Sequence, residues 1–163
     1  MGGVFIFGYG SIINKSTHKA WASGTSAASE THASCAGVAT VRRSFGYKRS
    51  WNFRSSTGFT ALGVNKSSVE STDINGILYQ VHESELPGFD LREVGYDRIA
   101  VELHHVDLHP EANFTLEEGD RVWIYVPQVE QFADENHPLV SAAVHSSLYV
   151  EMFRADAGLY AGL

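Results

Sequence analysis

The sequence predicts an α+β fold built on a mixed, largely antiparallel sheet that is curled or closed into a small barrel, with a few helices. Strand-like apolar segments outnumber helical ones, and no regular alternation of strand and helix indicates βαβ units. With 163 residues, 44% of them hydrophobic and 19% charged, the chain has the size and composition of one globular domain over residues 1–163.

The first predicted element is a buried strand in the apolar segment of residues 4–13, which Gly8 and Gly10 interrupt. Glycine allows the backbone to turn tightly and leaves no Cβ between its N–H groups and an approaching ligand. The turn Gly8-Tyr9-Gly10-Ser11 is therefore a candidate cradle for an anion or a carbonyl oxygen. An ordinary strand-to-loop transition explains this segment, taken alone, equally well.

The remaining elements follow from periodicity and from turn-forming residues. Residues 16–34, rich in Ser, Ala and Thr, predict a short helix and a surface loop. Further strands are predicted at residues 36–53, 61–64, 74–81, 96–109 and 121–126. Helical turns are predicted at residues 84–87 and 90–93, and a helix with a broad apolar face at residues 138–154.

The charge balance and the single cysteine exclude several function classes. The net charge is −7, with 19 acidic and 12 basic residues, which argues against a general nucleic-acid binder and favours a small-metabolite protein. Cys35 alone allows no intramolecular disulfide, and without a partner motif it is not expected to act as a nucleophile. No basic region precedes residues 4–13, and that stretch is too short to span a bilayer. We therefore expect a cytoplasmic protein, monomeric or homodimeric, with no membrane partner.

Two other patterns favour structural explanations. His105, Asp107 and His109 alternate, so on a strand they would share a face and could bind a metal. A solvated strand face is the commoner explanation, and no metal is predicted. A basic and aromatic strip resembles a single-stranded nucleic-acid groove; it comprises Arg42, Arg43, Phe45, Tyr47, Lys48, Arg49, Trp51, Phe53 and Arg54. A solvated face, or guidance of an anionic substrate, is preferred to nucleic-acid binding.

Glu93 is the strongest candidate for catalysis. It lies between apolar neighbours where a helical turn meets a strand, and Gly95 allows a sharp change of direction. A carboxylate held there would be partly desolvated, which raises its pKa and suits it to general acid–base chemistry. The alternative is a solvated glutamate paired with Arg92 or Arg98.

Four segments occur in this order: residues 7–13, residues 46–49, residues 76–81 and Arg92-Glu93-Val94-Gly95-Tyr96. Together they resemble the γ-glutamylcyclotransferase-like family, which includes the ChaC-type enzymes that degrade glutathione and the AIG2-like proteins. The segment Phe7-Gly8-Tyr9-Gly10-Ser11-Ile12-Ile13 is similar to the family's Tyr-Gly-Ser signature. Gly46-Tyr47-Lys48-Arg49 resembles the Gly-Tyr-Arg-Arg strand of ChaC-type members, and Gly76-Ile77-Leu78-Tyr79-Gln80-Val81 resembles the Gly-Val-Leu-Tyr-x-Val strand. The resemblance extends over residues 4–126 and, more weakly, into the final predicted helix.

The resemblance implies a γ-glutamylcyclotransferase-like fold and a reaction that cyclises a γ-glutamyl group to 5-oxoproline, releasing an amine, with no cofactor. It implies that Glu93 is the general acid and base. It also implies that the backbone around Gly8, Tyr9, Gly10, Ser11 and Ile12 holds the substrate, with Tyr96 and Tyr125 lining the pocket. A non-catalytic member that binds a metabolite or a protein is the alternative.

Two departures bear on what that resemblance implies. Val94 separates Glu93 from Gly95, whereas many relatives have Glu followed directly by Gly. Asn14 stands where ChaC-type enzymes usually carry Trp, so specificity for glutathione stays open. A nucleophilic Ser11 would need a base that no sequence spacing identifies.

Overall fold

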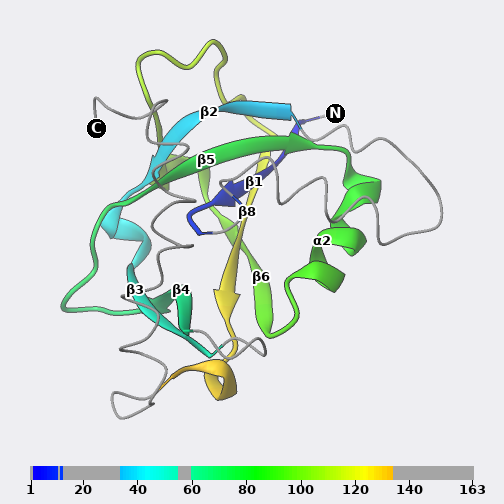
Figure 1. Ribbon diagram of the computed structural model, residues 1–163. Helices are drawn as coiled ribbons and strands as arrows, with labels where there is room; N and C mark the ends of the chain where they lie inside the picture. The colour runs from blue at the N-terminus through cyan, green and yellow to red at the C-terminus, as the bar shows by residue number, and fades with distance from the viewer. Residues whose placement is uncertain (1, 11, 13–33, 55–59, 134–163) are drawn as a thin grey trace.

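The computed structural model describes residues 2–10, 12, 34–54 and 60–133. It has eight strands and one α-helix over these residues (Figure 1). The strands are β1 (Val4–Gly8), β2 (Ser34–Val41), β3 (Tyr47–Arg54), β4 (Thr60–Lys66), β5 (Ile74–Val81), β6 (Tyr96–Val101), β7 (Val106–Leu108) and β8 (Arg121–Pro127). The helix is α2 (Leu86–Arg92).

Six strands form one mixed sheet in the order β6-β8-β1-β5-β2-β7, and β3 and β4 form a separate antiparallel pair. Strand β1 lies in the middle, antiparallel to β5 and parallel to β8, with Ile6 opposite Tyr79 on one side and Trp123 on the other. The other pairings in the large sheet are antiparallel. This arrangement confirms the predicted α+β class with a mixed, largely antiparallel sheet, which is curled and not closed into a barrel.

The two edge strands of this sheet are consecutive in the sequence. Only residues 102–105 separate β6 from β7, and residues Leu103–His105 form a 3₁₀ turn. The sheet therefore curls until its two edges approach each other at this corner. The prediction of one long strand over residues 96–109 is wrong, because apolar alternation continues through the turn and hides the change of sheet position.

The prediction of one strand over residues 36–53 is also wrong. The chain turns at Arg43–Phe45 and leaves the large sheet, so β2 and β3 belong to different sheets. Gly46 adopts the left-handed conformation with φ of 81°, and its N–H donates to the Arg43 carbonyl oxygen. Glycine is favoured at that conformation because other residues meet a steric penalty there.

Alternation along β1 divides the core between the two faces of the sheet. Val4 and Ile6 pack with Leu86 and Phe89 of α2, which covers that face. Phe5, Phe7 and Tyr9 point to the opposite face, where they share a cluster with Val64 of β4 and with partly buried Tyr47 of β3. The predicted helical turns at residues 84–87 and 90–93 correspond to a 3₁₀ turn at Glu83–Glu85 followed directly by α2.

Some sequence predictions fall outside the described residues. They are the helix at residues 138–154, nearly all of the segment at residues 16–34, Ser11 and Asn14. In the part of the chain that is described, no helix has the length and apolar character needed to cross a membrane.

Candidate functional site

Tyr9 directly follows the central strand β1 and connects its end to the neighbouring β8. The buried Tyr9 hydroxyl donates a 2.6 Å hydrogen bond to the carbonyl oxygen of Tyr125. Ile12 lies close to Gly8: a Cβ at Gly8 would be only 3.0 Å from Cγ2 of Ile12. The chain therefore folds back after Gly8. The turn predicted from Gly8 and Gly10 is therefore present, although Ser11 lies outside the described residues.

Leu62 of β4 connects this turn to the start of β6. A Cβ at Gly10 would lie 3.9 Å from both the Cβ and the carbonyl oxygen of Leu62. The Tyr96 hydroxyl donates to the same carbonyl oxygen over 3.4 Å, and its ring lies 4.1 Å from that of Phe53. Gly10 and Tyr96, which are distant in sequence, thus both lie close to Leu62, a residue for which no sequence pattern predicts a role.

Glu93 lies where α2 ends and the chain turns into β6. Its N–H donates to the Phe89 carbonyl oxygen over 2.9 Å, and its own carbonyl oxygen accepts from the Tyr96 N–H over 3.0 Å. Only 11% of its side chain is exposed, and the carboxylate lies 3.4 Å from Nη1 of Arg92. Desolvation by burial raises the pKa of Glu93, and the charge of Arg92 opposes this only in part.

Asp90, one helical turn before Glu93, extends the polar cluster to Tyr125. The Tyr125 hydroxyl donates to Oδ1 of Asp90 over 2.8 Å, and Nη2 of Arg98 lies 3.4 Å from Oδ2. The pKa of Tyr125 is raised mainly by burial, then by the Asp90 bond and charge, with a smaller contribution from the charge of Glu93. Sequence reasoning missed Asp90, although its i, i+3 spacing from Glu93 places both carboxylates on one side of a helix.

Arg49 of β3 is the basic residue most closely associated with the turn. Its Nη1 donates to the Asn75 carbonyl oxygen over 3.1 Å. Arg49 is an exposed residue; desolvation lowers its pKa, and the electrostatic influence of Tyr9 opposes that change. The sequence grouped Arg49 with a basic strip and did not single it out.

The structure brings most of the predicted site residues into one region. Tyr9 and Tyr125 are hydrogen-bonded, and Ile12, Tyr125 and Tyr96 share an apolar cluster with Phe89 of α2. Glu93 is close enough to Tyr125 to influence its pKa. Within the described part of the chain, the Glu93 carboxylate makes no hydrogen bond to the turn, so a substrate would have to bridge the two.

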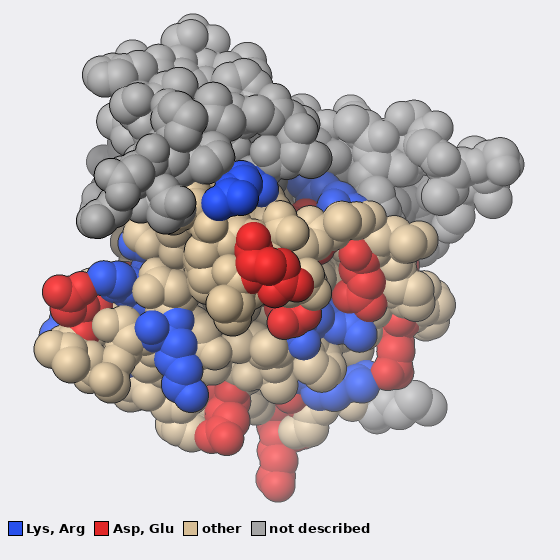
Figure 2. Space-filling view, turned by 90° about the horizontal axis from the view of Figure 1, so that it is seen from below, with Lys and Arg blue, Asp and Glu red and all other residues tan. Residues whose placement is uncertain are grey.

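The two patterns set aside in the sequence have ordinary surroundings. His105 lies in a 3₁₀ turn, Asp107 in β7 and His109 beyond it, so they do not alternate along one strand as predicted. Three cations of the basic strip pair with acids: Arg42 with Asp107, Arg43 with Asp73, and Lys48 with Glu70. On the face shown in Figure 2, basic and acidic side chains of the described residues are interspersed.

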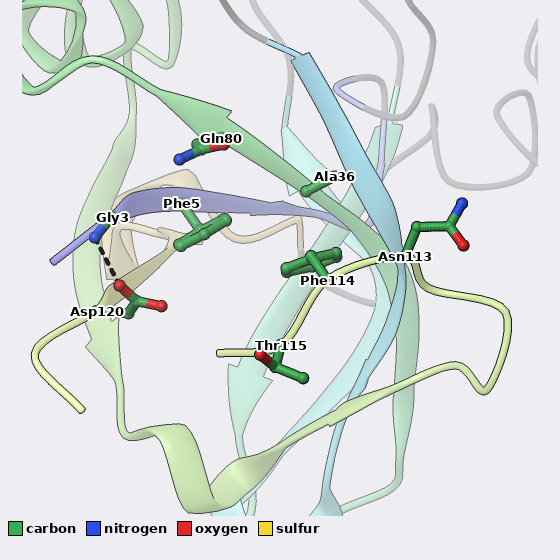
Figure 3. Close-up of a pocket in the computed structure, with 8 residues that line it drawn as sticks. All are labelled: Gly3, Phe5, Ala36, Gln80, Asn113, Phe114, Thr115 and Asp120. Carbon is green, nitrogen blue, oxygen red and sulfur yellow. Dashed lines mark hydrogen bonds between the residues drawn. The ribbon is translucent and has the colours of Figure 1, made fainter. Parts of the chain in front are cut away.

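A separate cavity of about 360 Å³ lies near the beginning of β1 (Figure 3). Phe5 and Phe114 stack in it with ring centroids 5.8 Å apart, and Oδ1 of Asp120 accepts from the Gly3 N–H over 2.5 Å. None of the site residues predicted from the sequence lines this cavity. It therefore adds nothing to the cluster around Glu93.

Comparison with known proteins identifies the fold. No protein-family model matches the sequence, and no curated protein matches it significantly. A solved gamma-glutamyl cyclotransferase superposes with a TM-score of 0.56 at 14% identity, over 94% of this chain and 87% of that one. An uncharacterized protein from Homo sapiens gives a TM-score of 0.56 at 14% identity over 96% and 88%. The Arabidopsis thaliana protein At3g28950.1 gives a TM-score of 0.53 at 21% identity over 99% and 86%.

These identities are low, so the comparisons concern the arrangement of the chain and not its activity. They agree with the order of motifs noted in the sequence and with the curled mixed sheet. The chain has the fold of the γ-glutamylcyclotransferase-like proteins.

Proposed function

We propose that this protein is a γ-glutamyl cyclotransferase, which converts the γ-glutamyl group of an amine, a peptide or glutathione to 5-oxoproline and releases the amine. The observation that carries the proposal is the desolvated carboxylate of Glu93, whose pKa is raised. It occurs beside Tyr96 and Tyr125 in a fold shared with a gamma-glutamyl cyclotransferase.

The reaction needs one group that moves a proton between two nitrogens. The α-amino nitrogen of the substrate attacks its own γ-carbonyl carbon, and Glu93 accepts the proton that this nitrogen loses. The C–N bond to the leaving amine then breaks, and Glu93 returns the proton to the departing nitrogen. Neither water nor a redox partner is consumed. Because the reaction is intramolecular, holding the substrate in a folded geometry provides much of the rate.

The turn after β1 is proposed to hold the glutamyl end of the substrate. Its backbone N–H groups, around Gly10 and Ile12, would stabilise the developing oxyanion. Arg49 is the proposed partner of the substrate α-carboxylate, because it is a cation of β3 whose pKa is influenced by Tyr9, the residue that follows β1. A guanidinium suits this task because it forms paired hydrogen bonds with carboxylates.

The test is to incubate the protein with γ-glutamyl dipeptides, a γ-glutamylamine and glutathione, and to measure 5-oxoproline. We expect Glu93→Gln to lower kcat by about 10²–10⁴-fold, the usual contribution of a general acid–base group. Glu118→Gln, which changes an exposed glutamate, is the matched control and should retain full activity. Comparing the substrates also identifies the leaving amine.

Two results would change the proposal. Turnover by Glu93→Gln at the wild-type rate would remove Glu93 from the mechanism. Binding of 5-oxoproline or a γ-glutamyl compound with no turnover of any substrate would favour the non-catalytic alternative. Arg49→Gln is expected to raise KM more than it lowers kcat, and an unchanged KM would exclude Arg49 as the carboxylate partner.

A further inference from the structure

Three side chains of metal-ligand type meet at the corner between the two edge strands, in residues 102–105. One ligand atom from each of Glu102, His104 and His105 can be chosen so that all three lie within 4.8 Å of one another. Oε2 of Glu102 is 3.3 Å from Nδ1 of His104, and the two imidazole centroids are 3.9 Å apart. This grouping differs from the alternating set of His105, Asp107 and His109 suggested by the sequence.

His105 has a partner that fixes its orientation. Its Nδ1 lies 2.8 Å from Oγ of Ser44, and its ring lies 5.7 Å from that of Phe45. Histidines that bind metals usually donate their second ring N–H to an oxygen, which selects the tautomer and holds the ring. With the proton on Nδ1 directed at Ser44, Nε2 of His105 carries the lone pair that a metal requires.

We propose that Glu102, His104 and His105 bind a divalent transition-metal ion, with Zn²⁺ as the best fit, and that Ser44 orients His105. Two imidazole nitrogens and one carboxylate oxygen are typical zinc ligands, and water would complete a tetrahedral site. Calcium and magnesium prefer sites made entirely of oxygens, so this ligand set disfavours both. The site is separate from Glu93 and does not depend on the proposed reaction.

The nearest cation does not exclude a bound metal. Arg42 adjoins the turn, since its N–H donates to the His105 carbonyl oxygen over 2.8 Å. Its guanidinium, however, is engaged by both carboxylate oxygens of Asp107. Glu102 supplies a negative charge within the cluster, and its side chain and that of His104 are exposed, so both can adjust to the ion.

The close spacing of the ligands decides which measurement is informative. The three ligands lie within four consecutive residues, so the unfolded chain retains part of the affinity for the ion. Binding to the unfolded state reduces any stabilisation by the metal. A shift in Tm is therefore a weak test, and binding has to be measured directly.

The experiment titrates the full chain with Zn²⁺ by calorimetry and with Co²⁺ by visible absorption, which reports tetrahedral coordination. We expect His104→Gln and His105→Gln each to lower the affinity by more than about 100-fold, beyond the loss typical of an outer partner. Ser44→Ala should lower it about 10-fold. His109→Gln, at the next turn of the chain, is the matched control and should bind as wild type does.

The variants also decide between the two groupings of histidines. Loss of affinity in His109→Gln, with His104→Gln unaffected, would overturn this site in favour of the alternating set. Binding that survives in a His104→Gln, His105→Gln double variant would place the ion elsewhere in the chain. No saturable binding by the wild type would refute the proposal. Circular dichroism of each variant checks that the fold is retained.

Discussion

In two of the arginine–carboxylate pairs of this molecule, the pKa values of the acids change in opposite directions. Glu93 lies 3.4 Å from Arg92, and the two side chains are 11% and 16% exposed. Asp107 is bound through both oxygens by Arg42, and their side chains are 49% and 52% exposed. The pKa of Glu93 is raised by burial, whereas that of Asp107 is lowered by its hydrogen bonds to Arg42.

The difference shows that burial and hydrogen bonding, and not the presence of a cation, decide how such a pair behaves. At the Glu93 site, removing water from the carboxylate outweighs the attraction of a cation 3.4 Å away. At the Asp107 site, water remains and the hydrogen bonds prevail. The carboxyl group in a pair of the first kind holds its proton to higher pH than an exposed one does. A pair of the second kind contributes only slightly to stability.

The largest expected effect comes from truncating Phe89, a buried aromatic side chain in the helix that precedes Glu93. Phe89 of α2 is 1% exposed and packs in the cluster with Ile6 and Tyr125, and its carbonyl oxygen accepts from the Glu93 N–H. Phe89→Ala should lower the free energy of unfolding by about 3–5 kcal/mol, the usual cost of a lost core aromatic. Chemical denaturation measures this loss. Leu91→Ala in the same helix is the control; Leu91 is 77% exposed and alanine favours a helix, so a comparable loss there would show that burial of Phe89 is not the cause.

Removing the cation next to Glu93 gives an intermediate effect. Arg92 lowers the pKa of Glu93, so Arg92→Gln should raise that pKa further. If Glu93 must be ionised to accept a proton, the acid limb of the kcat/KM profile moves to higher pH. A shift of that midpoint by a factor of ten in proton concentration corresponds to a difference of about 1.4 kcal/mol in how Arg92 interacts with the two protonation states of Glu93. Arg121→Gln removes an equal charge from the exposed pair with Glu83 and should leave the limb in place.

The smallest effects concern stability, and they have opposite signs in the two regions. Because the folded pKa of Glu93 is raised, wild type loses stability as pH rises from about 4.3, the ordinary value, through the folded pKa. Glu93→Gln avoids this loss, so its stability relative to wild type should increase with pH. Denaturation measured from pH 4 to about pH 7 tests this, and a difference independent of pH would contradict the buried, ionisable Glu93.

Asp107 reverses the sign of that dependence. Its lowered folded pKa contributes stability above about 3.9, the ordinary value, and this contribution is lost as pH falls through the folded pKa. Asp107→Asn should therefore be less stable than wild type at neutral pH, by less than about 1 kcal/mol because the pair is exposed. The difference should disappear in acid and shrink in high salt.

Local patterns predicted several elements well, because their signals lie within a few residues. The strand expected at residues 74–81 coincides with β5, and the strand expected at residues 121–126 differs from β8 by one residue. The pairing of β1 with β8, in contrast, joins residues more than a hundred positions apart. No local pattern contains that information, and the breaks at Arg43–Phe45 and Leu103–His105 were missed for the same reason.

The residues of the candidate site also divide into those with a local sequence signal and those without one. Glu93 and the glycine turn could be predicted because their signals are local: apolar residues flank the carboxylate, and two closely spaced glycines interrupt an apolar segment. Asp90 and Leu62 were missed because their contacts involve neighbours that only the fold supplies, and Arg49 was identified only as one member of a basic strip. Leu62 in particular contributes a backbone carbonyl oxygen, which is present at every residue and so has no sequence signal.

The corner between β6 and β7 also bears on how the protein avoids self-association. Exposed sheet edges present unpaired backbone groups that can recruit strands from other molecules. Here one edge strand, β7, has only three residues. Asp107 at its centre accepts hydrogen bonds from Arg42, which directly follows the neighbouring strand β2. The other edge strand, β6, carries Asp97 and Arg98. A short edge strand and charged side chains on both edge strands are features that disfavour edge-to-edge pairing.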